Sequence, residues 1–421
     1  MNATSAAERI PAGWQAENFR PIGYSDLGGR RGAFKIAITE KNGRWYLFLG
    51  HLWHQGWSIV DVTDPDAPRL VKFIPGPANT WTIQVTLHGN LMLTALQRVS
   101  PAWGGDPARP FEEGVILWDI EAPENPRELS RWRTGSTGTH RNIYPGGDYA
   151  YLSAALPGFS SRLLVTLDVR DPRNPKEAGR FWLPGQKDGE APPAGAPVGF
   201  HGPLNISADG RTGYLGYAPA VLVLDTADKA AMKIVGRLDM VPPFGDAHAG
   251  PQSLHTVLPV PGRELLIVSS EAHAEGCDKE PYNYVALIDI SDPAHPRLQS
   301  FFPEPVPPPG AAFSHYCEKG GRFGPHNTNQ ELHNPFVEAR GDIVYYTWFN
   351  AGLRAFDIRD ARRLVETGWF VPPVPDRRAG PMPRTALVTQ TEDVAVDARG
   401  NVFITDKQWG LFILRYEGVA A

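Results

Sequence analysis

Cysteine is scarce in this chain of 421 residues, since only Cys277 and Cys317 occur and neither belongs to a CxxC pair. The common cysteine-based zinc and redox motifs are therefore excluded. Both cysteines lie in long loops around the same repeat and could meet. We nevertheless expect free thiols, because the cytosol, which is the location expected below, is reducing.

The sequence also lacks an apolar run long enough to cross a bilayer, and it lacks a block rich in Lys and Arg. With a formal net charge of −5, it favours neither nucleic acid nor an anionic membrane as a partner. No basic segment followed by an apolar stretch opens the chain, so a cytoplasmic location is expected. A small molecule is the expected partner, and the oligomeric state is left open.

Long helical periodicity is absent, whereas a short repeat recurs throughout the chain. Each copy has an apolar strand that ends near an aspartate, a turn rich in Asp and Pro, and a second strand. A unit this small cannot bury its own apolar face, and a recurrence of roughly 50 residues suits four-stranded blades. The clearest copies are 57–76, 115–135, 164–185 and 285–305, weaker ones are 221–240 and 353–373, and a half-copy occupies 411–418.

The apolar strands WSIVD, LVTLD and VALID resemble the LVIVD-repeat family of β-propellers. The resemblance covers nearly the whole chain and implies an all-β fold, with residues 1–421 forming a single seven-bladed propeller. It says little about the reaction, because propellers serve both as enzymes and as scaffolds.

The last repeat lacks its outer strand, which predicts how the ring closes. Inner and second strands are expected at 34–50, 81–96, 139–154, 200–217, 254–270, 332–349 and 391–406. The seventh repeat stops at Tyr416, one strand short. We expect residues 18–27 to supply the missing strand, because such an overlap staples the first and last blades and removes an exposed edge.

Loop lengths predict which face of the disc is functional. The turns between first and second strands are short, and the opposite face receives the long insertions. Long ordered loops are uncommon unless they build a lid or a binding site. These loops are 97–114, 183–200, 269–284, 303–326 and 371–393.

Histidines recur at the head of the inner strands, on that same face. Counting back eight to ten residues from the end of each first turn reaches His140, His201, His255 and His333 in blades three to six. The same count reaches Glu392 in blade seven and Lys35 in blade one. Because inner strands line the channel, the four imidazoles should converge there. His326 is kept as the alternative ligand from blade six, or as a group that contacts substrate.

Neutral imidazoles at one level predict a single divalent transition-metal ion, with iron first and Mn, Zn or Cu also open. Glu392 could orient a ligand imidazole or act as a base, and Lys35 could transfer a proton. His54 and His273, on the same face, could contact substrate or donate a proton. Aromatic side chains crowd this face and favour an apolar or aromatic organic substrate.

Three functions fit this pattern. The leading one is a metal-dependent oxygenase, because the layout is similar to the four-histidine iron site of the carotenoid-cleaving propeller oxygenases, although none of their motifs is present. The second is a lyase or hydrolase in which a divalent ion acts as a Lewis acid. The third is a propeller that binds a protein partner without catalysis. Four neutral ligands do not decide between the two kinds of enzyme.

Overall fold

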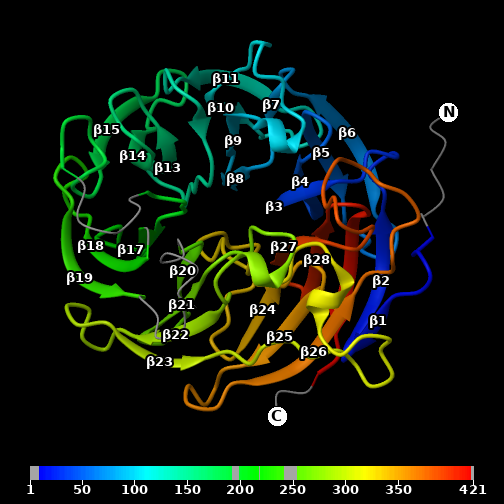
Figure 1. Cartoon of the computed structure of the whole chain (residues 1–421). Coiled ribbons are helices and arrows are strands. Elements are labelled where there is room, and N and C mark those ends of the chain that lie inside the picture. The colour runs from blue at the N-terminus through cyan, green and yellow to red at the C-terminus, as the bar shows by residue number, and fades with distance from the viewer. Residues whose placement is uncertain (1–8, 192–198, 218, 241–253, 419–421) are drawn as a thin grey trace.

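The computed structural model describes residues 9–191, 199–217, 219–240 and 254–418, which form a disc of antiparallel sheets around a central axis (Figure 1). Among these residues the strand pairings form five four-stranded sheets and one nine-stranded sheet. We divide the nine-stranded sheet between β9 and β12 and number the resulting blades one to seven in chain order. Blades two and three are joined by pairing between β9 and β12. The all-β propeller fold predicted from the sequence is confirmed.

The first four blades follow the chain in regular order from the axis outward. Blade one holds β3 (Ala33–Lys41), β4 (Arg44–His51), β5 (Gly56–Asp61) and β6 (Arg69–Pro75). Blade two holds β8 (Val85–His88), β9 (Leu91–Arg98), β10 (Gly114–Asp119) and β11 (Arg127–Trp132), and β7 (Thr80–Trp81) also pairs with β9. Blade three holds β12 (Gly138–Thr139), β13 (Tyr149–Ala155), β14 (Arg162–Asp168) and β15 (Lys176–Phe181). Blade four holds β16 (Asn205–Ile206), β17 (Thr212–Tyr217), β18 (Ala220–Asp225) and β19 (Lys233–Asp239).

The last two blades each include a strand from the N-terminal segment. Blade five holds β20 (Thr256–Pro259), β21 (Leu265–Ser269), β22 (Val285–Asp289) and β23 (Arg297–Phe301). Blade six holds β24 (Ile343–Thr347), β25 (Leu353–Asp357), β26 (Val365–Val371) and β1 (Gln15–Glu17). Blade seven holds β27 (Thr391–Val396), β28 (Asn401–Asp406), β29 (Gly410–Tyr416) and β2 (Phe19–Ser25). Three short 3₁₀ helices, η1 (Pro101–Trp103), η2 (Cys277–Lys279) and η3 (Tyr316–Lys319), lie in the loops.

The ring closes as the sequence predicts. Strand β2 pairs antiparallel with β29 and completes blade seven. Phe19 on β2 is buried and packs its ring 5.0 Å from that of Tyr416. Strand β1, which the sequence analysis did not foresee, pairs with β26 and extends blade six (Figure 1). The N-terminal segment therefore ties two neighbouring blades together and covers both of their edges.

An aspartate recurs at the end of the third strand of the repeat, and it has a local structural role. In each of six described copies, the aspartate at the end of the third strand accepts a hydrogen bond, 2.8–3.0 Å long, from the backbone N–H two residues further on. This Asx turn reverses the chain into the fourth strand. The six residues are Asp61, Asp119, Asp168, Asp225, Asp289 and Asp357.

Blade six departs from the predicted strand positions. The sequence analysis placed its inner and second strands at 332–349, but β24 begins only at Ile343. The chain next to the axis is reduced to an isolated bridge between Thr328 and Tyr346. The connection from this bridge to β24 is longer than the tight turns of the other blades, so a fixed count along the sequence does not hold here.

The core lies between neighbouring blades, where apolar faces of adjacent sheets pack together. Tyr345 and Phe370 of blade six, for example, belong to one buried cluster with Val394 and Phe412 of blade seven. None of the helices in the described ranges has the length and apolar character that a membrane span requires.

Candidate metal centre

Four imidazoles from four successive blades lie in a row around the axis. The ring centroids of His140 and His201 are 4.7 Å apart, those of His201 and His255 are 4.8 Å apart, and those of His255 and His326 are 4.8 Å apart. The convergence expected for blades three, four and five is therefore present. In blade six the neighbouring histidine is His326, the alternative.

The backbone explains why these rings share one level. The N–H of His140 donates to the carbonyl oxygen of Ser153 at 2.8 Å, and the N–H of His255 donates to that of Ser269 at 2.8 Å. The N–H of His326 makes the equivalent bond, 2.9 Å long, to Thr347. These three histidines thus occupy the same register at the head of their inner chain segments, opposite the second strand.

His333, the favoured ligand of the sequence analysis, does not lie with the other imidazoles. Its Nε2 is 2.5 Å from the carbonyl oxygen of Ile206, and its side chain lines a separate cavity of about 900 Å³ together with Tyr149 and Lys229. The choice of His333 over His326 is wrong as a matter of position. Counting back from Asp342 falls short of His326, because the connection before β24 is long and the count ends inside it.

The carboxylate of Glu271 lies among the imidazoles, which the sequence analysis missed. Its Oε2 is 3.6 Å from Nε2 of His255 and 3.7 Å from Nε2 of His201. Its Oε1 is 3.7 Å from Nε2 of His326. These separations are too long for hydrogen bonds. Two donors that bind one ion at about 2.0–2.2 Å lie about 3–3.5 Å apart, so the observed spacing is close to that of a shared ion.

The protonation states suit metal binding. Burial lowers the pKa of His326 to about 3 and holds the pKa of His140, His201 and His255 well below the usual value. These imidazoles are therefore neutral and offer lone pairs. Burial alone would raise the pKa of Glu271, but electrostatic interactions with neighbours that include His273 and Arg322 outweigh it and bring the pKa to about 2. The buried Nε2 of His201 has no hydrogen-bond partner among the described residues. Donor atoms of His201, His255 and Glu271 all lie within 4.8 Å of one another, and this set of two neutral nitrogens and one carboxylate fits a divalent ion.

Glu392 lies behind this cluster, where an orienting residue is required. Nδ1 of His326 is 2.6 Å from the carbonyl oxygen of Glu392 and 3.2 Å from its carboxylate Oε2. With the Nδ1 proton held there, Nε2 of His326 faces Glu271. Burial raises the pKa of Glu392 to about 6, although the ammonium group of Lys407 contacts its other oxygen.

The other predicted site residues lie at different distances from the cluster. His273 is at the exposed rim, with Nε2 3.7 Å from Oε2 of Glu271. Lys35 forms an ion pair of 3.3 Å with the buried Asp393 and does not line the cavity around the histidines. His54 is exposed, 6.4 Å from His51 between ring centroids, and is also outside that cavity.

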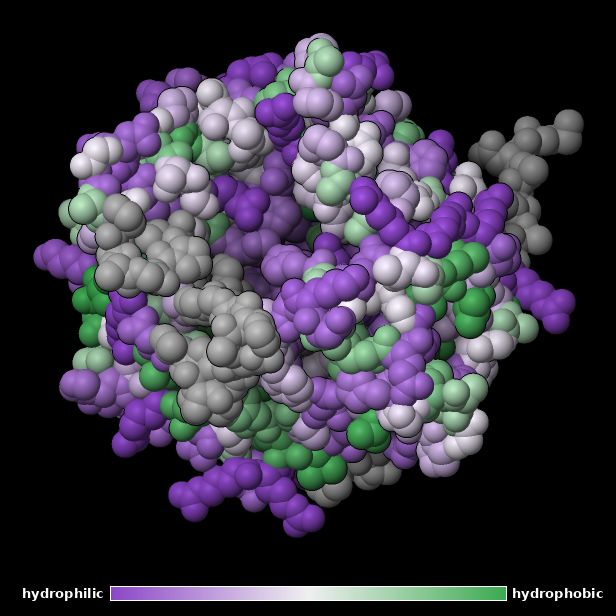
Figure 2. All heavy atoms as spheres, in the orientation of Figure 1, coloured by the Kyte–Doolittle hydropathy of each residue, from purple (hydrophilic) through white to green (hydrophobic). Residues whose placement is uncertain are grey.

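A cavity of about 190 Å³ opens beside the four histidines and Glu271. Figure 2 shows this face hollowed near the middle of the disc, with mostly hydrophilic residues around the hollow. One wall is apolar and aromatic, formed by Phe34, Leu52, Trp81, Ile83 and Trp103. We call this set the aromatic wall. The remaining polar lining includes three arginines, Arg141, Arg162 and Arg322.

Sequence reasoning missed Glu271, Arg162 and Arg322, and only one of them left a usable signal. Glu271 follows the second strand of blade five and is two residues before His273, which the sequence analysis did select. Arg162 opens the third strand of blade three, and Arg322 lies in the long loop before His326. Neither arginine stands on an inner strand, so a search of inner strands could not reach them.

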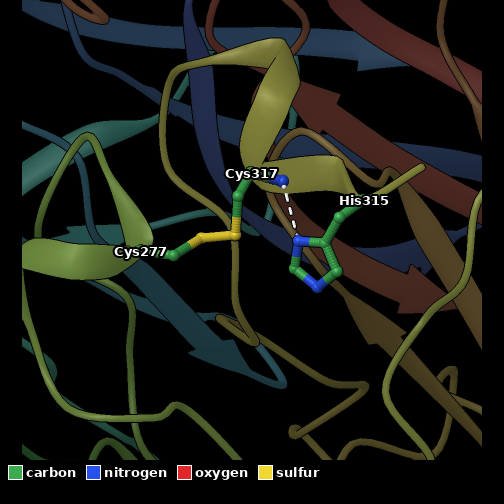
Figure 3. Close-up of side chains that lie close together, drawn as sticks. All are labelled: Cys277, His315 and Cys317. Atoms are coloured by element: carbon green, nitrogen blue, oxygen red, sulfur yellow. Dashed lines mark hydrogen bonds between the residues drawn. A yellow bond between two sulfur atoms is a disulfide. The ribbon is translucent and has the colours of Figure 1, made fainter. Parts of the chain in front are cut away.

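The two cysteines form a disulfide between the loops that carry site residues (Figure 3). The Cα atoms of Cys277 and Cys317 are 5.9 Å apart. The expectation of free thiols is therefore wrong. Although His315 lies beside them (Figure 3), the joined sulfurs are not thiolates that could bind a metal. The cytoplasmic location stays a prediction, and the disulfide favours an oxidising compartment instead.

Comparison with known proteins supports the fold and the repeat. Residues 280–302 match the LVIVD repeat. The structure is similar to that of the periplasmic gluconolactonase PpgL of Pseudomonas aeruginosa, with a TM-score of 0.56 and 10% identity over 88% of this chain and 99% of that one. It is also similar to a protein from Lactobacillus plantarum, with a TM-score of 0.53 and 10% identity over 92% of this chain and 97% of that one. None of the curated proteins matches the chain. The repeat match and the arrangement of blades support a β-propeller fold that contains an LVIVD repeat.

Proposed function

We propose that this protein is a metal-dependent hydrolase that opens an ester or lactone bond of a small organic substrate. The observation that carries the proposal is the position of Glu271, whose carboxylate lies 3.6–3.7 Å from the Nε2 atoms of His201, His255 and His326. These four residues would hold the ion, and His140 stands next to His201 in the same row. A divalent ion bound there would polarise a carbonyl oxygen and make a water molecule more acidic.

The chain supplies the remaining parts of such a site. Glu392 fixes the tautomer of His326 by accepting its Nδ1 proton, as outer residues around metal ligands commonly do. His140 is held in a similar way by Gln97, whose Oε1 is 2.6 Å from Nδ1. His273 is at the rim between the cavity and solvent, where it can carry a proton in or out.

Hydrolysis is better supported than the oxygenase reaction that the sequence favoured. One similar structure is that of a gluconolactonase. At 10% identity this likeness extends to the fold alone, so the proposal depends on the side chains of the site. A mixed set of imidazoles and one carboxylate is also a common ligand set of hydrolytic metal sites.

Metal content measured on the purified full-length chain tests the proposal. We expect about one equivalent of a divalent ion in the wild-type protein and a large loss in His255→Ala. His295→Ala is the matched control, because His295 is exposed and pairs only with Asp292. A panel of lactones and carboxylic esters should then be hydrolysed by the loaded protein without oxygen. Oxygen-dependent turnover, or unchanged metal content in His255→Ala, would contradict the proposal.

A further inference from the structure

The cavity beside the histidines holds more positive than negative charge. Arg322 is paired with Glu271, with Nη1 3.3 Å from Oε1, and Lys407 is paired with Glu392. Arg141 and Arg162 line the same cavity, and no carboxylate among the described residues is within hydrogen-bond reach of either guanidinium. With neutral imidazoles the site carries two uncompensated positive charges, and a bound divalent ion would add to them.

The two uncompensated arginines are held in different ways. Arg141 is fully occupied by the scaffold, because it donates to the carbonyl oxygens of Gly202 and His255 and to the side-chain oxygens of Asn327 and Gln330. Arg162 has one long contact, 3.4 Å from Nη2 to Nδ1 of His201, and its buried Nε has no partner among the described residues. An arginine with donors left over in a cavity is suited to a ligand.

Metal binding would free Arg162 further. When Nε2 of His201 binds an ion, Nδ1 keeps its proton and cannot accept a hydrogen bond from Arg162. The guanidinium would then have no acceptor among the described residues that line the cavity, although it remains next to the ion. An anionic group of a substrate is the acceptor that this position lacks.

Another part of the cavity lining is aromatic. The rings of Trp81 and Trp103 lie 5.3 Å apart in an edge-to-face arrangement. The guanidinium of Arg322 lies 5.0 Å above the ring of Trp103 and 5.4 Å from that of Phe349. The cationic and aromatic parts of the lining therefore meet at Arg322.

We propose that the substrate is a small organic acid with one ring, whose carboxylate binds Arg162 and whose ring packs on the aromatic wall. The inference rests on the proposed function, since the bond to be hydrolysed would lie between these two contacts. The cavity of about 190 Å³ is smaller than the roughly 300–1,000 Å³ of pockets that hold drug-sized ligands, which favours a single ring.

Equilibrium binding of benzoate tests this inference without turnover. Calorimetric titration of the full-length protein should give at least tenfold tighter binding of benzoate than of benzamide, which has the same shape and no charge. Each titration is run on the metal-loaded protein and on protein treated with a chelator. If benzoate still binds more tightly than benzamide in the chelated protein, the arginine site binds the carboxylate without the ion. This outcome does not depend on the metal proposal, so the two proposals can fail separately.

Variants then locate the contacts. Arg162→Met should weaken benzoate binding about tenfold to a hundredfold, as expected for loss of a charge-assisted hydrogen bond. Arg162→Lys should restore part of the affinity, which shows that the fold is intact. Arg170→Met is the matched control, because Arg170 follows the same strand and pairs with Asp168 at the surface. Equal binding of benzoate and benzamide, or wild-type affinity in Arg162→Met, would overturn the inference.

Discussion

Replacing Glu271 with glutamine is expected to weaken binding of the proposed metal ion by about a hundredfold or more. Glu271 is the one carboxylate in the group of donor atoms with His201 and His255 among the described residues. Changes in residues that only support ligands already cost about 10–100-fold in affinity, and loss of a charged ligand should cost at least as much. Glutamine has nearly the same shape, so the imidazoles should keep their positions.

The effect can be worked out as a stability difference. At a metal concentration one hundred times the wild-type Kd, binding adds about 2.7 kcal/mol to the free energy of unfolding. A hundredfold weaker site at the same concentration gains only about 0.4 kcal/mol. The variant should thus lose about 2.3 kcal/mol of metal-dependent stabilisation.

The assay must separate this effect from a change in the metal-free protein. Loss of the Glu271 charge leaves Arg322, to which it is paired at 3.3 Å, without its counter-charge, and that alone destabilises the fold. Urea unfolding is therefore compared with and without added Mn²⁺ or Zn²⁺ for each variant. Glu366→Gln is the matched control, since Glu366 is paired with the buried Arg354 outside the site at 3.1 Å. The same metal-dependent gain in Glu271→Gln and wild type would refute the reasoning.

Three further predictions concern stability. Phe19→Ala should lower the free energy of unfolding by about 3–5 kcal/mol, because it removes a buried ring from the closing strand, whereas Arg20→Ala at the exposed neighbouring position should have little effect in the same urea titration. Burial lowers the pKa of His51 to about 3. As the pH drops below about 6.5, this histidine takes up a proton in the unfolded chain but not in the folded protein. The free energy of unfolding should therefore fall between about pH 6.5 and pH 3, by up to about 5 kcal/mol. His51→Gln should be less sensitive to pH over that range, and an unchanged pH dependence would exclude this cause. The double variant Cys277→Ser, Cys317→Ser should lower the free energy of unfolding by up to about 4 kcal/mol, because the disulfide links residues 40 positions apart. Equal unfolding midpoints of variant and wild type would contradict this prediction.

The closing strand and the propeller were readable from the sequence because both depend on local patterns. Each repeat carries its own turn signal, as the Asx turn of Asp119 illustrates, and each apolar strand requires a neighbour to cover it. The missing strand after Tyr416 left one edge unpaired, and residues 18–27 had the matching pattern. The short strand β1 could not be predicted in this way, because the repeat of blade six already includes its outer strand, β26.

The histidines could be predicted wherever the first turn of the blade is short. His140, His201 and His255 lie within eight to ten residues of the end of the first turn, so this spacing predicted that they stand at a common level. In blade six the long connection before β24 broke that spacing, and only the backbone pairing of His326 with Thr347 decides between His326 and His333. Local sequence contains no information on which residue of a long connection faces the axis.

The sequence by itself thus determined the repeated blades, their closure and the level at which the imidazoles stand. The tertiary structure alone decided the rest of the site: the carboxylate of Glu271, the unpaired guanidinium of Arg162, the choice of His326 and the pairing of the two cysteines. These groups come from different strands and loops in different blades. Their positions depend on how the blades are arranged around the axis, and no spacing within one repeat records that arrangement.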